Sequence, residues 1–161
     1  MEHLGGVQHE ADAWRSFAGA IGAWELLPAG MFAVIETASG EWAGRVGPVM
    51  PHLWPVKEVG WGLSRRFEGR GYALEAAVAC IDFVFDELGW ATVSHLIAEE
   101  NTRSQALARR LGSEPVAGEV QMPGSLSKYQ VTEWRQSRTT WEKGRERLDE
   151  LVPRTRRGGQ R

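Results

Sequence analysis

The feature that most constrains the fold is a strand, a glycine-containing turn and a long helix in direct succession. Residues 58–64 predict a strand, and residues 71–88 predict a helix, because apolar side chains recur there at three- and four-residue steps until Gly89. Residues 91–98 predict a second strand. A β-α-β unit of this kind has right-handed connectivity and places both strands in one sheet. We therefore expect an α/β fold with a mixed sheet.

The turn between strand and helix has the composition of an anion site. Its glycines, Gly69 and Gly71, let several backbone N–H groups converge at the positive end of the helix dipole, which suits a pyrophosphate. A tight turn that simply needs small residues is the alternative. A Walker A loop is excluded because no Gly-Lys-Ser/Thr follows, and a dinucleotide fingerprint is disfavoured because Leu74 stands where its third glycine belongs.

The rest of the chain predicts further helices and strands around this unit. We expect helices over 9–27, 102–111 and 135–150, and strands over 31–37, 41–49, 114–122 and 128–134. The chain of 161 residues fits one domain, whose folding buries roughly 70% of the unfolded-chain surface. We assign that domain to residues 1–134, a C-terminal helix to 135–152 and a basic disordered tail to 153–161.

Composition narrows the class of protein. The formal net charge is −2, which favours neither a nucleic-acid partner nor an anionic membrane surface. One cysteine, Cys80, allows no internal disulfide, and the four histidines show no metal-ligand spacing, so we expect no metal. The start of the chain lacks a signal-peptide pattern, and no apolar run reaches the ~18 residues of a membrane span. We expect a cytoplasmic protein without a membrane partner.

Two motifs together resemble one enzyme superfamily. Arg66-x-x-Gly69-x-Gly71 followed by a helix resembles motif A of the GCN5-related N-acetyltransferases (GNAT), and Asn101-x-x-Ser104 resembles their motif B at matching spacing. The phrase Glu58-Val-Gly-Trp-Gly-Leu resembles the branch named after RimJ and RimL. The resemblance covers about residues 9–134 and implies a GNAT fold. It also implies acetyl-CoA as co-substrate and an amine as acceptor.

The resemblance also implies which residues hold the co-substrate. Strands 58–64 and 92–98 are expected to splay apart so that the pantetheine arm lies between them. A backbone N–H near Leu63 is expected to polarise the thioester carbonyl. Asn101 is expected to contact the pantetheine arm, and Ser104 to lie near the sulfur. The pyrophosphate is expected to rest on the backbone N–H groups of Arg66, Phe67, Glu68, Gly69, Arg70, Gly71, Tyr72 and Ala73.

Attack by an amine requires a base, because the ammonium must first lose a proton. Deprotonating a lysine-type amine at neutral pH costs roughly 4–5 kcal/mol, whereas an α-amine costs about 1–1.5 kcal/mol. Glu58, at the start of the strand beside the co-substrate, is the best-placed base, acting directly or through water. A strand-end surface carboxylate is the alternative. His52 and Trp54 either line the acceptor pocket or pack within their loop.

The chain departs from the family pattern at two places. Many relatives carry a tyrosine as general acid seven residues after the motif B asparagine, where this chain has Ala108, so Ser104 or a water would serve. Relatives also begin with a strand and a helix before the segment that resembles 9–27, and only eight residues precede it here. We therefore expect a fold lacking the first strand and helix. The exposed edge of strand 31–37 would then be an aggregation or dimerisation surface.

The sequence predicts an acetyl-CoA-dependent N-acetyltransferase that acts on a primary amine by direct attack. The acceptor is either a protein N-terminus or a small-molecule amine. The rival hypothesis is a non-catalytic module, derived from a degenerate GNAT domain, that binds acetyl-CoA or another protein.

Overall fold

The computed structural model of the chain describes residues 9–152. The predicted tail over 153–161 lies outside the described residues. The described elements begin with helix α1 (Glu10–Leu26) and end with helix α4 (Arg138–Asp149). Most predicted elements are confirmed in type and place, with boundaries that differ by a few residues.

One six-stranded mixed sheet organises the molecule, with strand order β1-β2-β3-β4-β6-β5. Neighbouring strands run antiparallel except β3 and β4, which are parallel and joined by helix α2. The crossover predicted from the sequence is thus at the centre of the sheet. The strands are β1 (Phe32–Ile35), β2 (Trp42–Val49), β3 (Glu58–Leu63), β4 (Thr92–Ala98), β5 (Glu114–Pro115) and β6 (Val131–Ser137).

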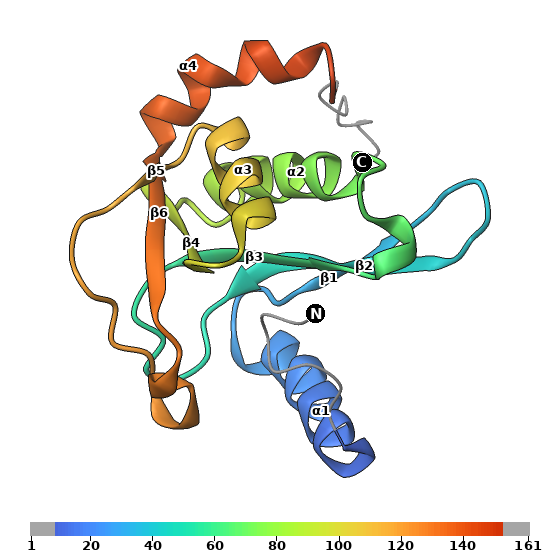
Figure 1. Cartoon of the computed structure of the whole chain (residues 1–161). Coiled ribbons are helices and arrows are strands. Elements are labelled where there is room, and N and C mark those ends of the chain that lie inside the picture. The colour runs from blue at the N-terminus through green and yellow to red at the C-terminus, as the bar shows by residue number, and fades with distance from the viewer. Residues whose placement is uncertain (1–8, 153–161) are drawn as a thin grey trace.

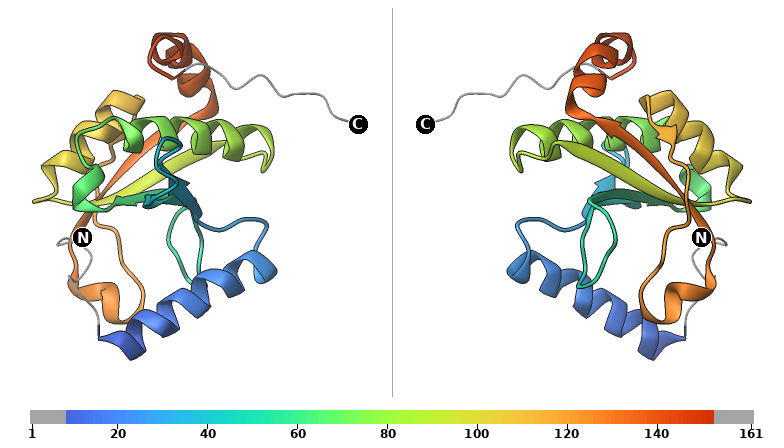
Figure 2. Two further views of the ribbon diagram at one scale, coloured as in Figure 1. Left: turned by 90° about the vertical axis from the view of Figure 1, so that its right-hand side faces the viewer. Right: turned by 90° about the vertical axis from the view of Figure 1, so that its left-hand side faces the viewer.

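Helices cover the sheet unequally (Figures 1 and 2). Helices α2 (Tyr72–Asp86) and α3 (Thr102–Leu111) lie on one face, α4 lies beyond α2, and α1 lies on the opposite side of the sheet. The apolar stripe of α2 packs on the sheet, where Val78, Ile81 and Val84 meet Val59 and Val93 in the fully buried core. Because this stripe is buried, the three- and four-residue spacing of its apolar side chains predicts the helix correctly.

The strand predicted over 114–122 is wrong for most of its length. Strand β5 is only Glu114–Pro115, and a 3₁₀ helix (η3, Gly124–Lys128) precedes β6. Pro115 cannot donate to a ladder, and Gly118 has a φ of 117°, which takes the chain out of the extended region. The strand predicted over 128–134 is shifted accordingly and runs over Val131–Ser137.

Helix α4 begins at Arg138, three residues later than predicted, because β6 continues to Ser137. The Ser137 side chain accepts from the Thr140 backbone N–H and so caps the helix. Its sequence is charged, yet Trp141, Arg145 and Leu148 are buried. Arg145 and Trp141 both donate to Asp82 of α2, with Arg145 Nε at 3.0 Å from Oδ2. Helix α4 therefore shares the core of the sheet.

The aromatic contact of helix α1 with the sheet is made near its C-terminal end. The Trp24 ring packs edge-on against Phe32 at 5.0 Å, while Trp14, Phe17 and Ile21 stay exposed, and every residue of α1 is at least partly exposed. Strand β1 beside it forms the edge of the sheet. A homodimer through that edge stays a prediction. None of the helices in the described part of the chain is both long and apolar enough to cross a membrane.

Candidate functional site

The central strands β3 and β4 separate after a single paired position. Their parallel register joins Glu58 to Ser94, near the start of both strands. Beyond that point side chains bridge the strands: the Leu96 N–H donates to Glu58 Oε1 at 3.2 Å, and His95 Nδ1 bonds the Val59 carbonyl at 2.7 Å. The divergence implied by the resemblance is therefore present, and it opens toward the carboxyl ends of the strands.

The open end of these strands faces the N-terminus of α2. Gly71 is the N-cap, with a φ of 89°, and Gly69 has a φ of 74°, so both positions require glycine. The cap makes no side-chain hydrogen bond, which leaves the first-turn N–H groups of α2 directed at this space. These groups and the helix dipole can hold a phosphate.

Two of the predicted phosphate donors are already used within the turn. The N–H groups of Phe67 and Glu68 donate to the carbonyls of Ser64 and Arg65 in the short 3₁₀ helix η2 (Arg65–Phe67). The Phe67 ring is buried and anchors the turn, with the guanidinium groups of Arg66 and Arg70 above it at 5.1 and 5.5 Å. The anion site thus narrows to the backbone from Gly69 through Ala73.

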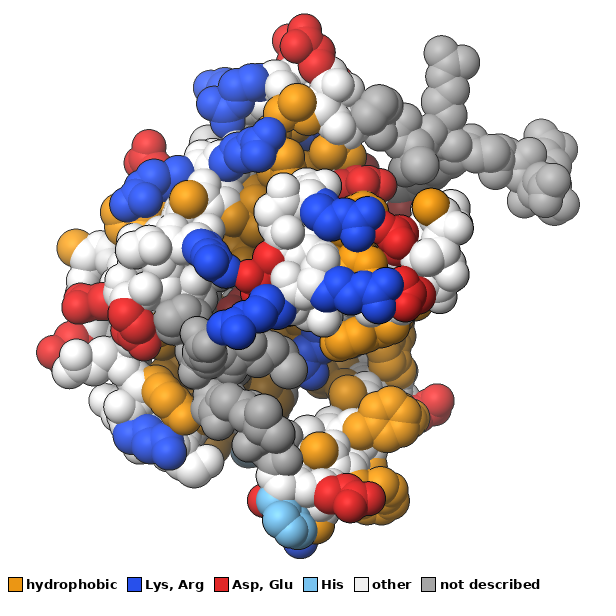
Figure 3. All heavy atoms as spheres, turned by 45° about the vertical axis from the view of Figure 1, so that its right-hand side comes forward, with side chains coloured by type: hydrophobic (Ala, Val, Ile, Leu, Met, Phe, Trp, Pro, Cys, Tyr) orange, Lys and Arg blue, Asp and Glu red, His pale blue; other side chains and the backbone are white. Residues whose placement is uncertain are grey.

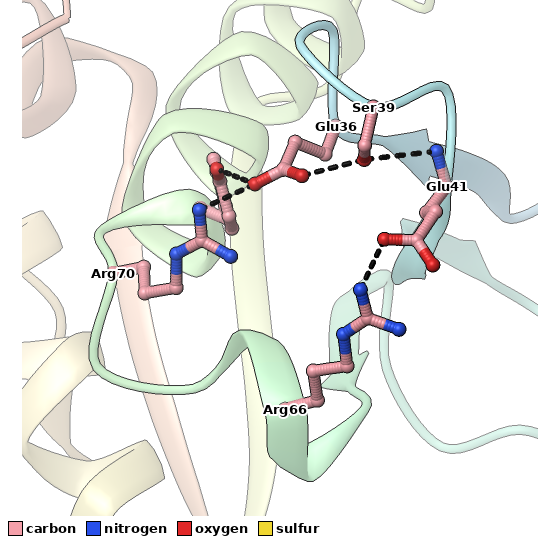
Figure 4. A network of polar contacts seen from close by, with 6 residues as sticks. Glu36, Ser39, Glu41, Arg66 and Arg70 are labelled. Atoms are coloured by element: carbon pink, nitrogen blue, oxygen red, sulfur yellow. Dashed lines mark hydrogen bonds and ion pairs between the residues drawn. The ribbon is translucent and has the colours of Figure 1, made fainter.

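The arginines of the turn are paired with carboxylates of the β1–β2 hairpin (Figure 4). Arg66 pairs with Glu41, and Arg70 pairs with Glu36, which also accepts from Tyr72 Oη and Ser39 Oγ at 2.5 Å each. The hydrogen bonds from Ser39 and Tyr72 and the Arg70 charge hold the pKa of Glu36 below its ordinary value. Sequence reasoning missed these partners, because the hairpin lies about 30 residues away along the chain.

Arg66 and Arg70 are both exposed, as are many basic side chains on this side of the molecule (Figure 3). The Arg66–Glu41 pair joins two solvent-accessible groups and is worth at most about 1 kcal/mol, so an incoming phosphate can compete for the Arg66 guanidinium. Arg70 is paired with the buried Glu36 and is held more firmly beside the anion site.

The residues predicted from motif B cap helix α3. Asn101 is its N-cap, and the Asn101 Oδ1 accepts from the Ser104 N–H at 3.1 Å. The Asn101 amide nitrogen, a donor, is not used in that cap. The side chain of Arg103 pairs with Glu68, which ties α3 to the turn before α2. Leu63, predicted near the thioester, ends β3 opposite Gly44 and is half-buried.

Glu58 is a buried carboxylate at the closed end of the opening. Only 7% of its surface is exposed, and its two oxygens accept from the Leu96 N–H and from Trp54 Nε1, the latter at 2.7 Å. Burial raises the pKa of Glu58 to about 7, and the two hydrogen bonds limit that rise. A carboxylate that gains and loses a proton near neutral pH can act as a general base.

A second carboxylate lies across β4 from Glu58. Glu133 of β6 is nearly buried, is paired in register with Leu96, and accepts from Ser94 Oγ at 2.6 Å. The sequence motifs give no signal for Glu133, since only the antiparallel pairing of β4 with β6 brings it here. The two carboxylates flank the point at which β3 and β4 begin to separate.

An apolar cavity adjoins the Glu58 side of the sheet. It has a volume of about 180 Å³ between α1 and the end of β2, with Met31 and Val49 in its lining. Both side chains also approach Gly60, and a Cβ built on Gly60 would lie 3.7 Å from Glu58 Oε1. The cavity therefore lies close to the Glu58 carboxylate.

Ser104 lies on the other side of the sheet, beside Trp61 of β3. The Trp61 Nε1–H donates to Ser104 Oγ at 3.2 Å, and both side chains are half-buried. Ala108, at the position where many relatives have tyrosine, is fully buried against Ile97 and Trp134. Helix α3 therefore presents a hydroxyl group at Ser104, whereas Ala108 has no side chain that could donate a proton.

The remaining candidate residues differ in reactivity and in their position relative to Glu58. Cys80 is buried, and burial raises the pKa of its thiol to about 12. His52 is exposed in the β2–β3 loop, whereas Trp54 of that loop contacts Glu58. Within residues 9–152, no group of three or more His, Cys, Asp or Glu side chains is arranged to hold a metal ion.

Comparison with known proteins identifies the family. The family model described as "Acetyltransferase (GNAT) domain" matches residues 1–114. The acetyltransferase from Agrobacterium tumefaciens is 31% identical, with a TM-score of 0.72, and the match covers 85% of this chain and 77% of that protein. The ribosomal-protein-S5-alanine acetyltransferase from Vibrio fischeri is 16% identical, with a TM-score of 0.64 over 84% of this chain and 78% of that one, and shares the fold.

Among curated proteins, YkkB from Bacillus subtilis is 37% identical over 79 residues. That match covers 48% of this chain and spans 46% of YkkB, so it extends over less than half of either protein. The family model and the Agrobacterium structure cover much more of the chain, and the family model includes the β3–α2–β4 unit and its turn. The chain belongs to the GNAT family of acetyltransferases.

Proposed function

We propose that the protein transfers an acetyl group from acetyl-CoA to a primary amine by direct attack, without a covalent enzyme intermediate. The observation that carries the proposal is the position of Glu58. This buried carboxylate, with a pKa of about 7, lies where β3 and β4 begin to separate. The N-terminus of α2, whose cap makes no side-chain hydrogen bond, lies at the open end. One site thus combines a base with a phosphate-binding helix end.

The residues present fit acetyl-CoA. Backbone N–H groups from Gly69 through Ala73 would hold the pyrophosphate, with Arg66 and Arg70 beside it. The amide nitrogen of Asn101 would donate to the pantetheine arm. A backbone N–H near Leu63 would polarise the thioester carbonyl. Acetyl-CoA supplies the activated acetyl group, and the residues of this chain would bind it, polarise its thioester and accept the proton of the amine.

Glu58 supplies what the amine needs. Its carboxylate would accept the ammonium proton, directly or through water, before or during attack. A base with a pKa near 7 is about half ionised at neutral pH and still returns its proton readily. Glu133 on the same side is a second carboxylate near the acceptor, although Arg135 is paired with it at 3.7 Å.

For the acceptor, we propose an α-amine at a protein N-terminus. Its deprotonation costs about 3 kcal/mol less than that of a lysine-type amine, which suits a base with a pKa near 7. The apolar cavity between α1 and β2 would receive an apolar side chain of the acceptor. The RimJ/RimL-like phrase, and the fold shared with an acetyltransferase named for ribosomal protein S5, support the same class.

Thiol release from acetyl-CoA with a panel of amines tests this function. The panel contains peptides with free N-termini, the same peptides with blocked N-termini and a free lysine, and small amines. We expect release with free N-termini, increasing with pH through about 7 as Glu58 ionises. Glu58→Gln should lose at least about 100-fold in kcat. Glu114→Gln, an exposed carboxylate on β5, is the matched control and should retain activity.

The non-catalytic alternative is favoured by one observation, the buried alanine at residue 108. It predicts saturable binding of acetyl-CoA without thiol release for any amine in the panel. Normal turnover by Glu58→Gln would instead show that another group is the base. A homodimer and a cytoplasmic location also remain predictions. Light scattering tests the first and localisation of a tagged chain tests the second.

A further inference from the structure

The hydrogen bond between Trp61 and Ser104 has a fixed direction. An indole N–H can only donate, whereas a serine hydroxyl has one proton and two lone pairs. In the 3.2 Å contact between Trp61 Nε1 and Ser104 Oγ, the serine oxygen is therefore the acceptor. The Ser104 proton consequently remains available for a second, different acceptor.

The Trp61 ring is itself held in place by His95. The two ring centroids are 4.6 Å apart, and His95 is fully buried. Because the Val59 carbonyl can only accept, the contact at 2.7 Å puts the His95 proton on Nδ1. Burial lowers the pKa of His95 to about 4, so the ring is neutral at physiological pH. Trp61 thus packs against a buried neutral ring that does not titrate near pH 7.

Trp61 and Glu58 lie on opposite faces of the sheet. Side chains alternate along a strand, so residues 58 and 60 share one face and residues 59 and 61 share the other. Glu58 accordingly lies near Met31 on the α1 side, whereas Trp61 contacts Ser104 on the α3 side. A thioester between β3 and β4 would then meet the base on one side and the serine hydroxyl on the other.

We propose that Trp61 is a positioning residue that aims the Ser104 hydroxyl proton at the sulfur of the thioester. Glu58 accepts the amine proton as the new N–C bond forms. Ser104 donates a hydrogen bond to the sulfur as the C–S bond breaks and its electron pair goes to the sulfur. Ser104 keeps its proton, and the thiolate leaves as such or is protonated by water. This inference rests on the proposed function.

The need for Trp61 follows from the place of Ser104 in the first turn of α3. A serine hydroxyl in a helix readily donates to a nearby backbone carbonyl instead of to a ligand. A donor fixed on one lone pair of Ser104 Oγ restricts the directions that its proton can take. Without the indole N–H, we expect the hydroxyl to turn away from the sulfur.

The pKa of the CoA thiol in the binary complex tests this directly, measured from its ultraviolet thiolate absorbance as pH is raised. A charge-assisted hydrogen bond from Ser104 lowers that pKa, and Trp61→Phe keeps the ring but removes the N–H. We expect Trp61→Phe to raise the thiol pKa by about one unit. Ser104→Ala should raise it equally, and the double variant should raise it no further. Ser104→Thr, which keeps a hydroxyl, should stay near wild type.

Trp134→Phe is the matched control. The buried Trp134 Nε1 has no hydrogen-bond partner among the described residues, and Trp61 packs against the same apolar cluster. Its replacement should leave the thiol pKa unchanged. In steady-state assays, Trp61→Phe should lower kcat about tenfold with a smaller change in KM for acetyl-CoA.

The outcomes separate this inference from the proposed function. If CoA binds and its thiol pKa is the same in wild type, Trp61→Phe and Ser104→Ala, the role of Trp61 is wrong and the proposed function stands. If the thiol pKa shifts as expected but no amine is acetylated, the proposed function alone fails. If wild type does not bind CoA saturably, both are overturned. Should Trp61→Phe fail to fold, the pair Ser104→Ala and Ser104→Thr decides the role of the hydroxyl.

Discussion

Trp54 and Glu58 are joined by a hydrogen bond of 2.7 Å from the indole Nε1 to the carboxylate Oε2. The bond links the β2–β3 loop to the first residue of β3 and orients the carboxylate in a site from which water is largely excluded. It opposes the effect of burial on the pKa of Glu58, since a hydrogen bond to the charged form favours ionisation. The loop thus adjusts the base as well as lining the site.

Trp54→Phe should therefore move the activity profile toward higher pH. Loss of the indole donor raises the pKa of Glu58 further above its present value of about 7, by about half a unit to one unit. The increase of kcat/KM with pH should shift by that amount. Trp14→Phe, which alters an exposed indole of α1, should not move it. An unshifted profile for Trp54→Phe would show that this hydrogen bond does not control the base.

Glu58 should also make folding stability depend on pH. Its folded-state pKa of about 7 lies above the ordinary value of 4.5, so the native state binds the proton more tightly. The resulting stabilisation is complete below about pH 4.5 and is lost as pH rises through about 7. Glu58→Gln does not titrate, so it should gain about 3 kcal/mol relative to wild type between those limits. Urea unfolding at several pH values measures the difference, and a constant difference would contradict the raised pKa.

Gly71→Ala and Gly144→Ala should have opposite effects on stability. Neither new Cβ would meet any atom within 4 Å, but Gly71 has a φ of 89° and Gly144 lies inside α4. Alanine in the left-handed region costs about 1–2 kcal/mol, whereas alanine in a helix gains up to about 1 kcal/mol. Thermal unfolding of both variants checks this. Equal effects would mean that the turn before α2 relaxes freely.

Arg145→Ala should destabilise the packing of α4 on α2. The side chain is 1% exposed and is satisfied by Asp82, Asp149 and the Val152 carbonyl. Removing the cation leaves two partly exposed carboxylates and one carbonyl without their partner, which should cost about 1–3 kcal/mol. Lys143→Ala, on the exposed side of the same helix, should change the unfolding free energy by less than about 0.5 kcal/mol. A cost below about 1 kcal/mol for Arg145→Ala would show that α4 is not part of the cooperative core.

Helix α1 should contribute little to the stability of the chain. Phe17 is 65% exposed, so Phe17→Gln removes few contacts and should change the unfolding free energy by less than about 0.5 kcal/mol. Leu74→Ala in the core should cost about 2–5 kcal/mol by comparison. Denaturant titration of both variants measures the two effects. A large loss for Phe17→Gln would show that the apolar side of α1 is covered in solution.

Local signals were enough to predict the central unit. The apolar stripe of residues 71–88 and the alternation of 58–64 appear in β3 and α2 with boundaries within a few residues, because burial of each pattern depends on its own period. Gly69 and Gly71 form the predicted turn, and both have positive φ values that favour glycine. The strand predicted over 114–122 is wrong beyond Pro115. A segment with Pro115 and Gly118 can join a ladder only where a partner strand accommodates both residues.

Residue patterns along the chain are enough to predict the β-α-β unit, the turn that suits a phosphate and Glu58 as a candidate base. The packing of the strands was needed to learn that Glu58 is buried with a raised pKa, that Glu133 lies across β4 from it, and that Trp61 donates to Ser104. It also paired Arg66 and Arg70 with carboxylates of a distant hairpin. The reason is physical: periodicity and turn chemistry act over a few residues, whereas burial and pairing depend on which strands become neighbours in the sheet.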